Sequence, residues 1–212
     1  MKYLISVIAV VSLFSCTPGG KKSQSAGASD DGDTTVPANT DSDIGVEAIE
    51  RNVVVRTFNE YNSALSMATG VSVSHDAIIN EFNSIKNSLP ANNSASTFSS
   101  FSQVSALRLS FSYCDVYVNE SDIWKNYDFA NYDDNVILNM LMENLLDYDS
   151  SKSADVQKFS ELRSKLEDII KNKPVDGKVL VESTDGGTDS VKKRLTTMTC
   201  SAILSSSYYT VL

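Results

Sequence analysis

The chain has 212 residues, of which 42% are hydrophobic and 21% charged, a composition typical of a globular protein. Its formal net charge at pH 7 is −9. An acidic chain repels phosphate backbones, and we therefore expect the protein not to bind nucleic acid. The sequence carries no phosphate loop, haem motif or dinucleotide fingerprint, and we therefore expect no cofactor.

The first fifteen residues have the layout of a secretory signal peptide. Lys2 gives a short positive region, and the twelve residues from Tyr3 to Phe14 are uncharged and largely apolar. Such a run is too short to span a bilayer, which needs about 20 residues. We therefore expect residues 1–15 to be a cleaved leader.

The leader runs into Leu13-Phe14-Ser15-Cys16, which resembles the lipobox of bacterial lipoproteins. In that family the cysteine thiol is acylated and the leader is cut before it. The resemblance implies that acyl chains on Cys16 anchor the protein in a lipid bilayer. Thr17 stands where an aspartate would retain an enteric lipoprotein in the inner membrane. The same resemblance therefore implies the outer membrane, with the protein facing the periplasm or the cell surface.

Residues 17–43 predict a disordered tether behind the lipidated cysteine, so that 16–43 form one linker. The segment has no aromatic residue and a single large aliphatic side chain, Val36. It cannot bury enough apolar surface to offset its ordering entropy. As a flexible coil it would span roughly 30 Å, and about 90 Å at full stretch.

Helical periodicity dominates residues 44–212 and predicts one all-α domain, a bundle of five to seven helices. We expect a first helix to begin at Asp43 and to end at Gly70, and a second from Ser74 to Leu89 to stop at Pro90. The apolar positions of the first helix recur at Val46, Ile49, Val53, Phe58, Tyr61, Leu65 and Ala68, and those of the second at Ile78, Phe82, Ile85 and Leu89.

A third helix is expected from about Thr97 to Val118, with an apolar side and a serine side. The predicted apolar side consists of Phe98, Phe101, Val104, Leu107, Phe111, Cys114 and Val118, and the predicted polar side of Ser99, Ser102, Ser105, Ser110 and Ser112.

The rest of the domain predicts three more helices. Two run from Asn135 to Tyr148 and from Ala154 to Asn172, and the last begins near Thr188 or Asp189. A short strand is possible over 178–182. The inward positions are expected at Leu138, Leu141, Leu145 and Tyr148, then Phe159, Leu162, Leu166 and Ile169, and then Val191, Leu195, Met198 and Ala202.

Two further cysteines, Cys114 and Cys200, remain once Cys16 is modified. Two thiols in an exported, oxidising compartment most simply form one disulfide. The alternative, a pair of metal ligands, lacks partners because the chain has one histidine and no C-x-x-C spacing. We therefore expect a disulfide and no metal site.

The segment 119–134 is the first place to look for a binding site, because aromatic rings and carboxylates there could form a sugar or peptide pocket. The alternative is an irregular loop held by buried rings. The candidate residues are Trp124, Tyr127, Asp128, Phe129, Tyr132 and Asp133.

Two other constellations fail on inspection. His75 could serve a Ser-His-Asp or Cys-His site as base, but it stands at a predicted helix start, and no G-x-S-x-G elbow occurs. The stretch 147–155 spaces oxygen side chains as a calcium loop does. Lys152 and Lys158, however, occupy the positions where an EF-hand needs Gly and Glu. The sequence therefore names no catalytic residue.

Four short stretches are similar to a helical module of large bacterial surface proteins that also carry LamG-type domains. They are Asn62 to Val71, Ser88-Leu-Pro90, Leu107 to Cys114, and Cys200 to Ser205. The resemblance implies a cell-envelope or surface-display role and no known chemistry.

Three functions follow as hypotheses. The first is an anchored structural module that binds another envelope protein or polymer. An exposed apolar patch over a well-packed core would favour it. The second is a lipoprotein that binds a small hydrophobic or sugar ligand, which a dry cavity near Phe58, Phe82 and Phe111 would favour. The third, an envelope hydrolase, would need a concave acidic pocket with convergent polar groups.

Overall fold

The computed structural model describes residues 54–88, 98–182 and 187–211, which belong to one compact unit, and every regular element there is a helix. The predicted leader, Cys16, the tether and Pro90 lie outside the described residues. The six helices of ten or more residues are α2 (Phe58–Thr69), α3 (Asp76–Ile85), α4 (Ser100–Glu120), α6 (Asp134–Leu146), α7 (Ser153–Ile170) and α8 (Thr188–Leu204). They confirm the predicted all-α bundle. Two four-residue helices, α5 (Asp122–Lys125) and α9 (Ser207–Thr210), were not predicted.

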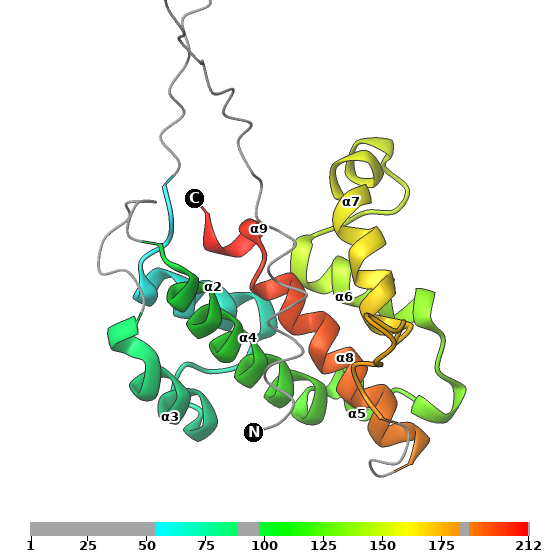
Figure 1. Cartoon of the computed structure of the whole chain (residues 1–212), viewed down its shortest axis with the longest axis horizontal. Coiled ribbons are helices and arrows are strands. Elements are labelled where there is room, and N and C mark those ends of the chain that lie inside the picture. The colour runs from blue at the N-terminus through cyan, green and yellow to red at the C-terminus, as the bar shows by residue number, and fades with distance from the viewer. Residues whose placement is uncertain (1–53, 89–97, 183–186, 212) are drawn as a thin grey trace, which may run out of the picture. The chain divides into compact units, whose positions relative to one another are not determined.

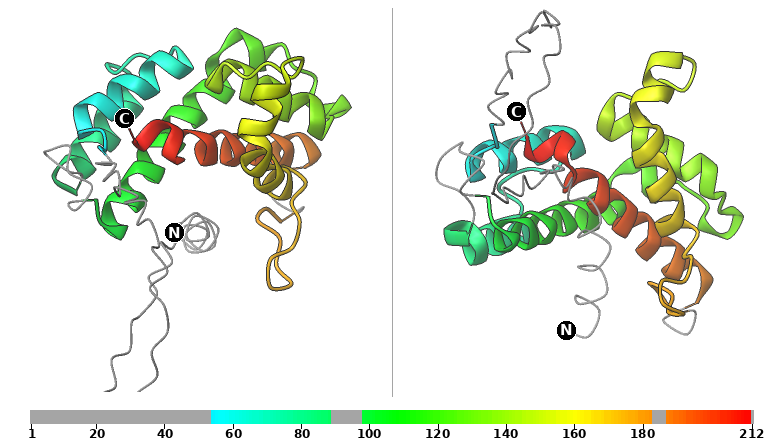
Figure 2. Two further views of the ribbon diagram at one scale, coloured as in Figure 1. Left: turned by 90° about the horizontal axis from the view of Figure 1, so that it is seen from above. Right: turned by 45° about the horizontal axis from the view of Figure 1, so that its top comes forward.

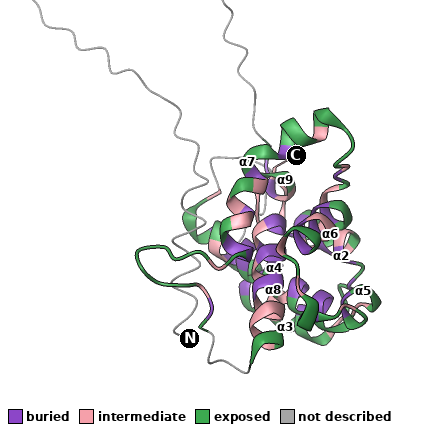
Figure 3. Cartoon of the chain, turned by 90° about the vertical axis from the view of Figure 1, so that its right-hand side faces the viewer, coloured by how far each residue is buried: buried purple, intermediate pink, exposed green. Residues whose placement is uncertain are grey.

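Helices α4 and α8 form the centre of the bundle (Figure 1). They run antiparallel, because the end of α4 lies beside the start of α8 and Ala106 lies near Leu204. On one side α2 and α3 pack against α4, and on the other α6 and α7 pack against α8 (Figure 2). The buried side chains face this central pair, while much of α7 and the 171–182 connection is exposed (Figure 3).

A disulfide joins the two central helices, as the sequence predicted. Cys114 of α4 is bonded to Cys200 of α8 with a Cα–Cα distance of 5.8 Å, and both side chains are fully buried. A bond of this kind requires the two backbones to approach closely. Small polar side chains are also buried on both helices: Ser105 and Ser110 on α4, and Thr196, Thr197, Thr199 and Ser201 on α8.

The burial of α4 agrees with the prediction only in part: Leu107, Cys114 and Val118 are buried as expected, but other positions differ. Ser102, Ser105 and Ser110 are buried, whereas Phe101 is 64% exposed and Phe111 45% exposed. The buried Ser110 hydroxyl has an acceptor within its own helix, since it donates to the carbonyl of Ala106 at 2.9 Å. With their hydrogen bonds made, serines can occupy a tight helix contact that a phenylalanine ring would force apart. The prediction placed side chains inside or outside by their polarity, whereas a close helix contact also favours small side chains.

Helix α2 begins later than predicted. Its first residue is Phe58, which follows a capping box. The Thr57 side chain accepts a hydrogen bond from the amide of Glu60, and the Glu60 carboxylate accepts one from the amide of Thr57 at 2.7 Å. Val55 instead pairs with Val211 in an isolated antiparallel bridge. Consecutive β-branched residues favour extended backbone, which explains the break. The predicted part of the helix before residue 54 lies outside the described residues.

Gly70 ends its helix as predicted, whereas the cap at Asp133 was not predicted. Gly70 ends α2 in the left-handed conformation at φ 70°. Asp133 caps α6, with its Oδ1 accepting from the amides of Asn135 and Val136 at 2.8 and 3.0 Å. The predicted inward leucines of α6 and α7 are buried, while in α8 only Leu195 of the four predicted positions is fully buried.

The possible strand over 178–182 does not form. The side chain of Asn172 binds this segment instead: its Oδ1 accepts from the amides of Leu180 and Val181 at 2.8 and 3.1 Å, and its Nδ2 donates to the Val181 carbonyl at 2.8 Å. An isolated bridge between Val175 and Lys178 closes a turn within it. One asparagine thus satisfies the backbone groups that a partner strand would otherwise have to satisfy.

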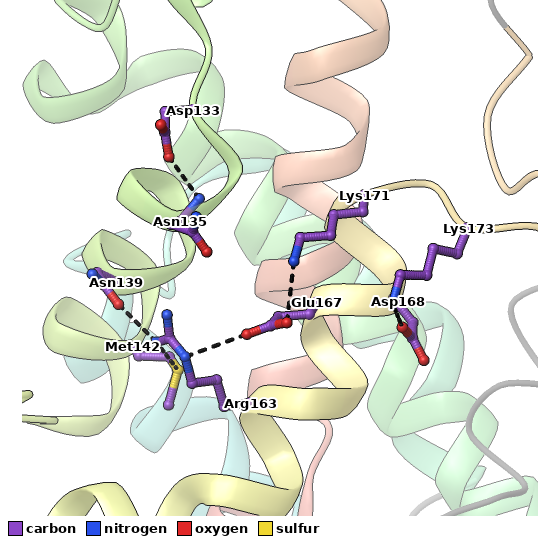
Figure 4. A network of polar contacts seen from close by, with 9 residues as sticks. All are labelled: Asp133, Asn135, Asn139, Met142, Arg163, Glu167, Asp168, Lys171 and Lys173. Atoms are coloured by element: carbon purple, nitrogen blue, oxygen red, sulfur yellow. Dashed lines mark hydrogen bonds and ion pairs between the residues drawn. The ribbon is translucent and has the colours of Figure 1, made fainter.

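Arg163 links α7 to α6 through a polar network (Figure 4). Its Nη1 donates to Asn139 Oδ1 at 2.7 Å, and its Nε lies 3.5 Å from Glu167 Oε1. Glu167 also receives Lys171 Nζ at 3.1 Å. The Arg163 side chain is only 25% exposed, so this contact is better shielded from water than a surface ion pair.

Replacing Arg163 with alanine should lower the free energy of unfolding by about 1–2 kcal/mol, because the charge-assisted bond to Asn139 is lost. Lys173→Ala is the matched control, because it breaks the exposed pair of Lys173 with Asp168 (2.5 Å) in the same region. That change should cost less than about 0.5 kcal/mol. Urea unfolding of both variants gives the comparison, and equal losses would show that Arg163 does not join the helices energetically.

Candidate functional site

The structure divides the six predicted binding residues between the core and the surface. Trp124 in α5 and Phe129 in the short 3₁₀ helix η4 (Phe129–Asn131) are buried, at 1% and 4% exposure. Their ring centroids lie 6.4 Å apart, and Tyr127 makes edge contacts with both, at 5.9 and 5.0 Å. Trp124 and Phe129 therefore hold the segment in place, as the alternative to a pocket predicted.

The acidic residues of the segment serve first as caps. Asp128 Oδ1 accepts from the Ala130 amide at 3.0 Å, and its Oδ2 accepts from Asn131 Nδ2 at 2.7 Å. Asp133 caps α6, as described above. In each role the carboxylate oxygens accept hydrogen bonds from neighbouring groups of the same segment. A carboxylate has about four acceptor positions, so Asp128 can still accept further hydrogen bonds.

Lysines from the first turns of α8 cover the rings of this segment. Lys192 Nζ lies 4.2 Å from the ring centroid of Tyr132, and Lys193 Nζ lies 5.4 Å from that of Phe129. Burial raises the pKa of the Tyr132 hydroxyl, so this group stays protonated at neutral pH. These cation–π contacts attach η4 to α8 and place the two basic side chains at the surface beside the segment.

A polar hollow of about 490 Å³ opens where this segment meets the central helices. Three of the predicted residues, Tyr127, Asp128 and Phe129, line it, whereas Trp124, Tyr132 and Asp133 do not. The residues that the sequence did not suggest are Asp115 and Asn119 of α4 and Asp189, Ser190, Lys193, Arg194 and Thr197 of α8. No local motif could have found them, because the antiparallel packing of α4 and α8 brings them together.

One exposed face of α4 leads into this hollow. Phe101, Val104, Arg108 and Phe111 recur at three- and four-residue steps, and we call them the α4 stripe. Arg108 is held within it by Glu81, with a 2.8 Å contact to Oε1. The stripe spans about 15 Å along the helix, and Asp115 follows it by one turn. Asp115, which lines the hollow, therefore lies on the same side of α4 as the stripe.

Around Phe58, Phe82 and Phe111, the described residues leave little space for an internal ligand. The rings of Phe58 and Phe82 are stacked with centroids 4.2 Å apart, and Phe111 is on the surface. A pocket beside Phe58, Tyr61 and Phe98 has a volume of only about 10 Å³, close to the minimum for a single water. A hydrophobic ligand therefore finds no room among these three predicted side chains.

His75 and the 147–155 loop have structural roles. His75 Nδ1 accepts from the Ala77 amide at 3.3 Å as the cap of α3, and Nε2 lies 3.4 Å from Glu120. Asp149 accepts from the amide and hydroxyl of Ser151, and with the nearby Lys152 ammonium these bonds lower its pKa. Among the described residues no group of three or more His, Cys, Asp and Glu side chains is arranged to hold a metal ion.

In comparisons with known proteins the chain matches no family model, no curated protein and no solved structure. Within residues 54–88, 98–182 and 187–211, none of the helices has the length and apolar character needed to cross a membrane.

Proposed function

We propose that the protein is a lipid-anchored envelope protein whose helical domain binds another envelope protein or polymer and carries out no catalysis. Cys16 in its lipobox context supplies the anchor to the outer membrane, and the following residues up to 43 form the tether. The tether lets the domain search about 30 Å from the bilayer, on the periplasmic or the cell-surface side.

The observation that supports this proposal is the exposure of the α4 stripe. Two phenylalanines on one helix face are 64% and 45% exposed, and aromatic rings that gather on one exposed face can mark an interaction site. Solvent exposure of such rings brings no stability to the monomer, whereas burying an aromatic side chain is a principal source of binding energy at interfaces. The stripe is therefore the surface that a partner would cover.

The polar hollow favours a second candidate, the binding of a small ligand. Its carboxylates, amide and tyrosine suit a sugar better than a hydrophobic molecule. Chemical-shift changes of Tyr127 and Asp128 on addition of envelope saccharides, with none at Phe111, would favour this candidate over protein binding.

The anchor is tested by fractionating cells that express the intact chain or its Cys16→Ala variant, followed by chemical cross-linking. The intact chain should incorporate a labelled fatty acid, sediment with the outer membrane and cross-link to specific envelope components. The variant should lose all three properties. A wild-type chain that takes up no fatty acid would contradict the anchored function.

A further inference from the structure

The α4 stripe and the hollow together define a partner of particular chemistry. We infer that they bind an amphipathic helix of another protein, whose apolar face covers Phe101 and Phe111 and whose end carries a basic side chain that enters the hollow. This inference rests on the proposed interaction function and specifies its surface and partner.

The shape of the surface selects a helix. The stripe is straight and about 15 Å long, which matches the apolar face of roughly ten residues of a partner helix. Recognition of an extended peptide by strand addition needs a sheet edge, and the described residues form only isolated bridges. Pairing of two helical faces is a recurrent mode that uses an apolar helix stripe.

The charges at one end of the stripe select a basic partner. Asp115, Asp128 and Asp189 line the hollow against two cations, Lys193 and Arg194. Lys193 is already placed over the Phe129 ring. Asp115 accepts a single described bond, from Asn119 Nδ2 at 3.0 Å, which leaves acceptor positions for an incoming cation. The chain's net charge of −9 adds a long-range attraction for basic partners.

The same charges argue against a second copy of this chain. A twofold axis through the centre of the stripe would place Phe101 of one copy beside Phe111 of the other. Each hollow would then lie beyond the start of the other copy's α4 and would gain no matching cation from the stripe. Two chains of net charge −9 also repel each other. Because the charged hollow lies at only one end of the stripe, a different protein is favoured over a second copy as the partner.

The test uses two synthetic helices of about 18 residues with the same leucine stripe, one ending in two lysines and the other in two glutamates. Fluorescence anisotropy measures their binding to the full-length protein at low and high salt. We expect the lysine peptide to bind about fivefold more tightly at low salt, with the preference lost at high salt. Phe111→Ser should weaken both peptides at least about tenfold.

Two variants separate the apolar and charged parts. The double substitution Asp115→Asn and Asp189→Asn should abolish the preference between the peptides. Val156→Ser, which changes a 44% exposed valine on α7, should leave binding unchanged. Equal affinity for the two peptides, no binding of either, or insensitivity to Phe111→Ser would overturn the inference. A dimer in sedimentation that Phe111→Ser abolishes would assign the stripe to a second copy and overturn it equally. Cross-linking in cells does not use these peptides, so it tests the interaction function separately.

Discussion

Removing the Cys114–Cys200 disulfide should lower the free energy of unfolding by about 4.5 kcal/mol, the largest single loss expected for this protein. The bond closes a loop between residues 86 positions apart, and in the chain-entropy model a loop of this size restricts the unfolded chain by that amount. The double variant Cys114→Ala and Cys200→Ala keeps buried polar atoms out of the contact. Urea unfolding followed by fluorescence of the single tryptophan, the buried Trp124, measures the change.

Reduction of the wild-type protein is an independent check. Both sulfurs are fully buried, so a thiol reagent reaches them only when α4 and α8 separate. We expect dithiothreitol to leave the bond intact under native conditions and to reduce it rapidly in urea. Fast reduction of the native protein, or a double variant as stable as the wild type, would show that the bond does not hold the central pair together.

Raising the pH above 10 should destabilise the fold steeply. Burial raises the pKa of the hydroxyls of Tyr61, Tyr113 and Tyr117 above their ordinary value, and that of Tyr209 to about 12. Above pH 10 the unfolded chain loses these protons while the folded chain keeps them. Stability is therefore complete below pH 10 and falls as the pH rises, by about 1.4 kcal/mol per pH unit for each tyrosine that is still protonated in the folded chain.

Tyr61 offers the control for this prediction. Its hydroxyl joins three helices, since it donates to the Leu204 carbonyl at 2.9 Å and lies 2.6 Å from Ser110 Oγ. Tyr61→Phe should cost about 1–3 kcal/mol at pH 7, because buried partners lose a hydrogen bond. It should also reduce the slope above pH 10 by about 1.4 kcal/mol per unit. An unchanged slope would exclude Tyr61 as one of the titrating groups.

Much of the fold follows from short-range signals in the sequence. The left-handed glycine after α2 and the leucine repeats of α6 and α7 are set by the backbone and by periodicity, which a single chain displays. The disulfide followed from the small number of cysteines and the expected compartment. These features need no knowledge of which helix packs against which.

The errors arise where packing decides. The buried serines of α4 depend on how the neighbouring helices pack around it, which no local pattern of α4 contains, and Phe101 and Phe111 are left exposed. The aromatic segment was identified correctly as a place where rings and carboxylates gather. Its contribution to a surface hollow, however, depends on Asp115 and Asp189, which lie far from it in sequence. Seven of the ten residues that line the hollow were therefore beyond reach of the sequence.

The central claim is that the α4 stripe is the face through which an anchored protein binds its partner. It is tested most directly by placing a photo-reactive phenylalanine analogue at position 111 or at position 156 in the full chain and illuminating living cells. The two native side chains are equally exposed, at 45% and 44%. We expect a discrete cross-linked envelope component from position 111 alone, and its loss in the Cys16→Ala background. Equal cross-linking from both positions, or none from position 111, would contradict the claim.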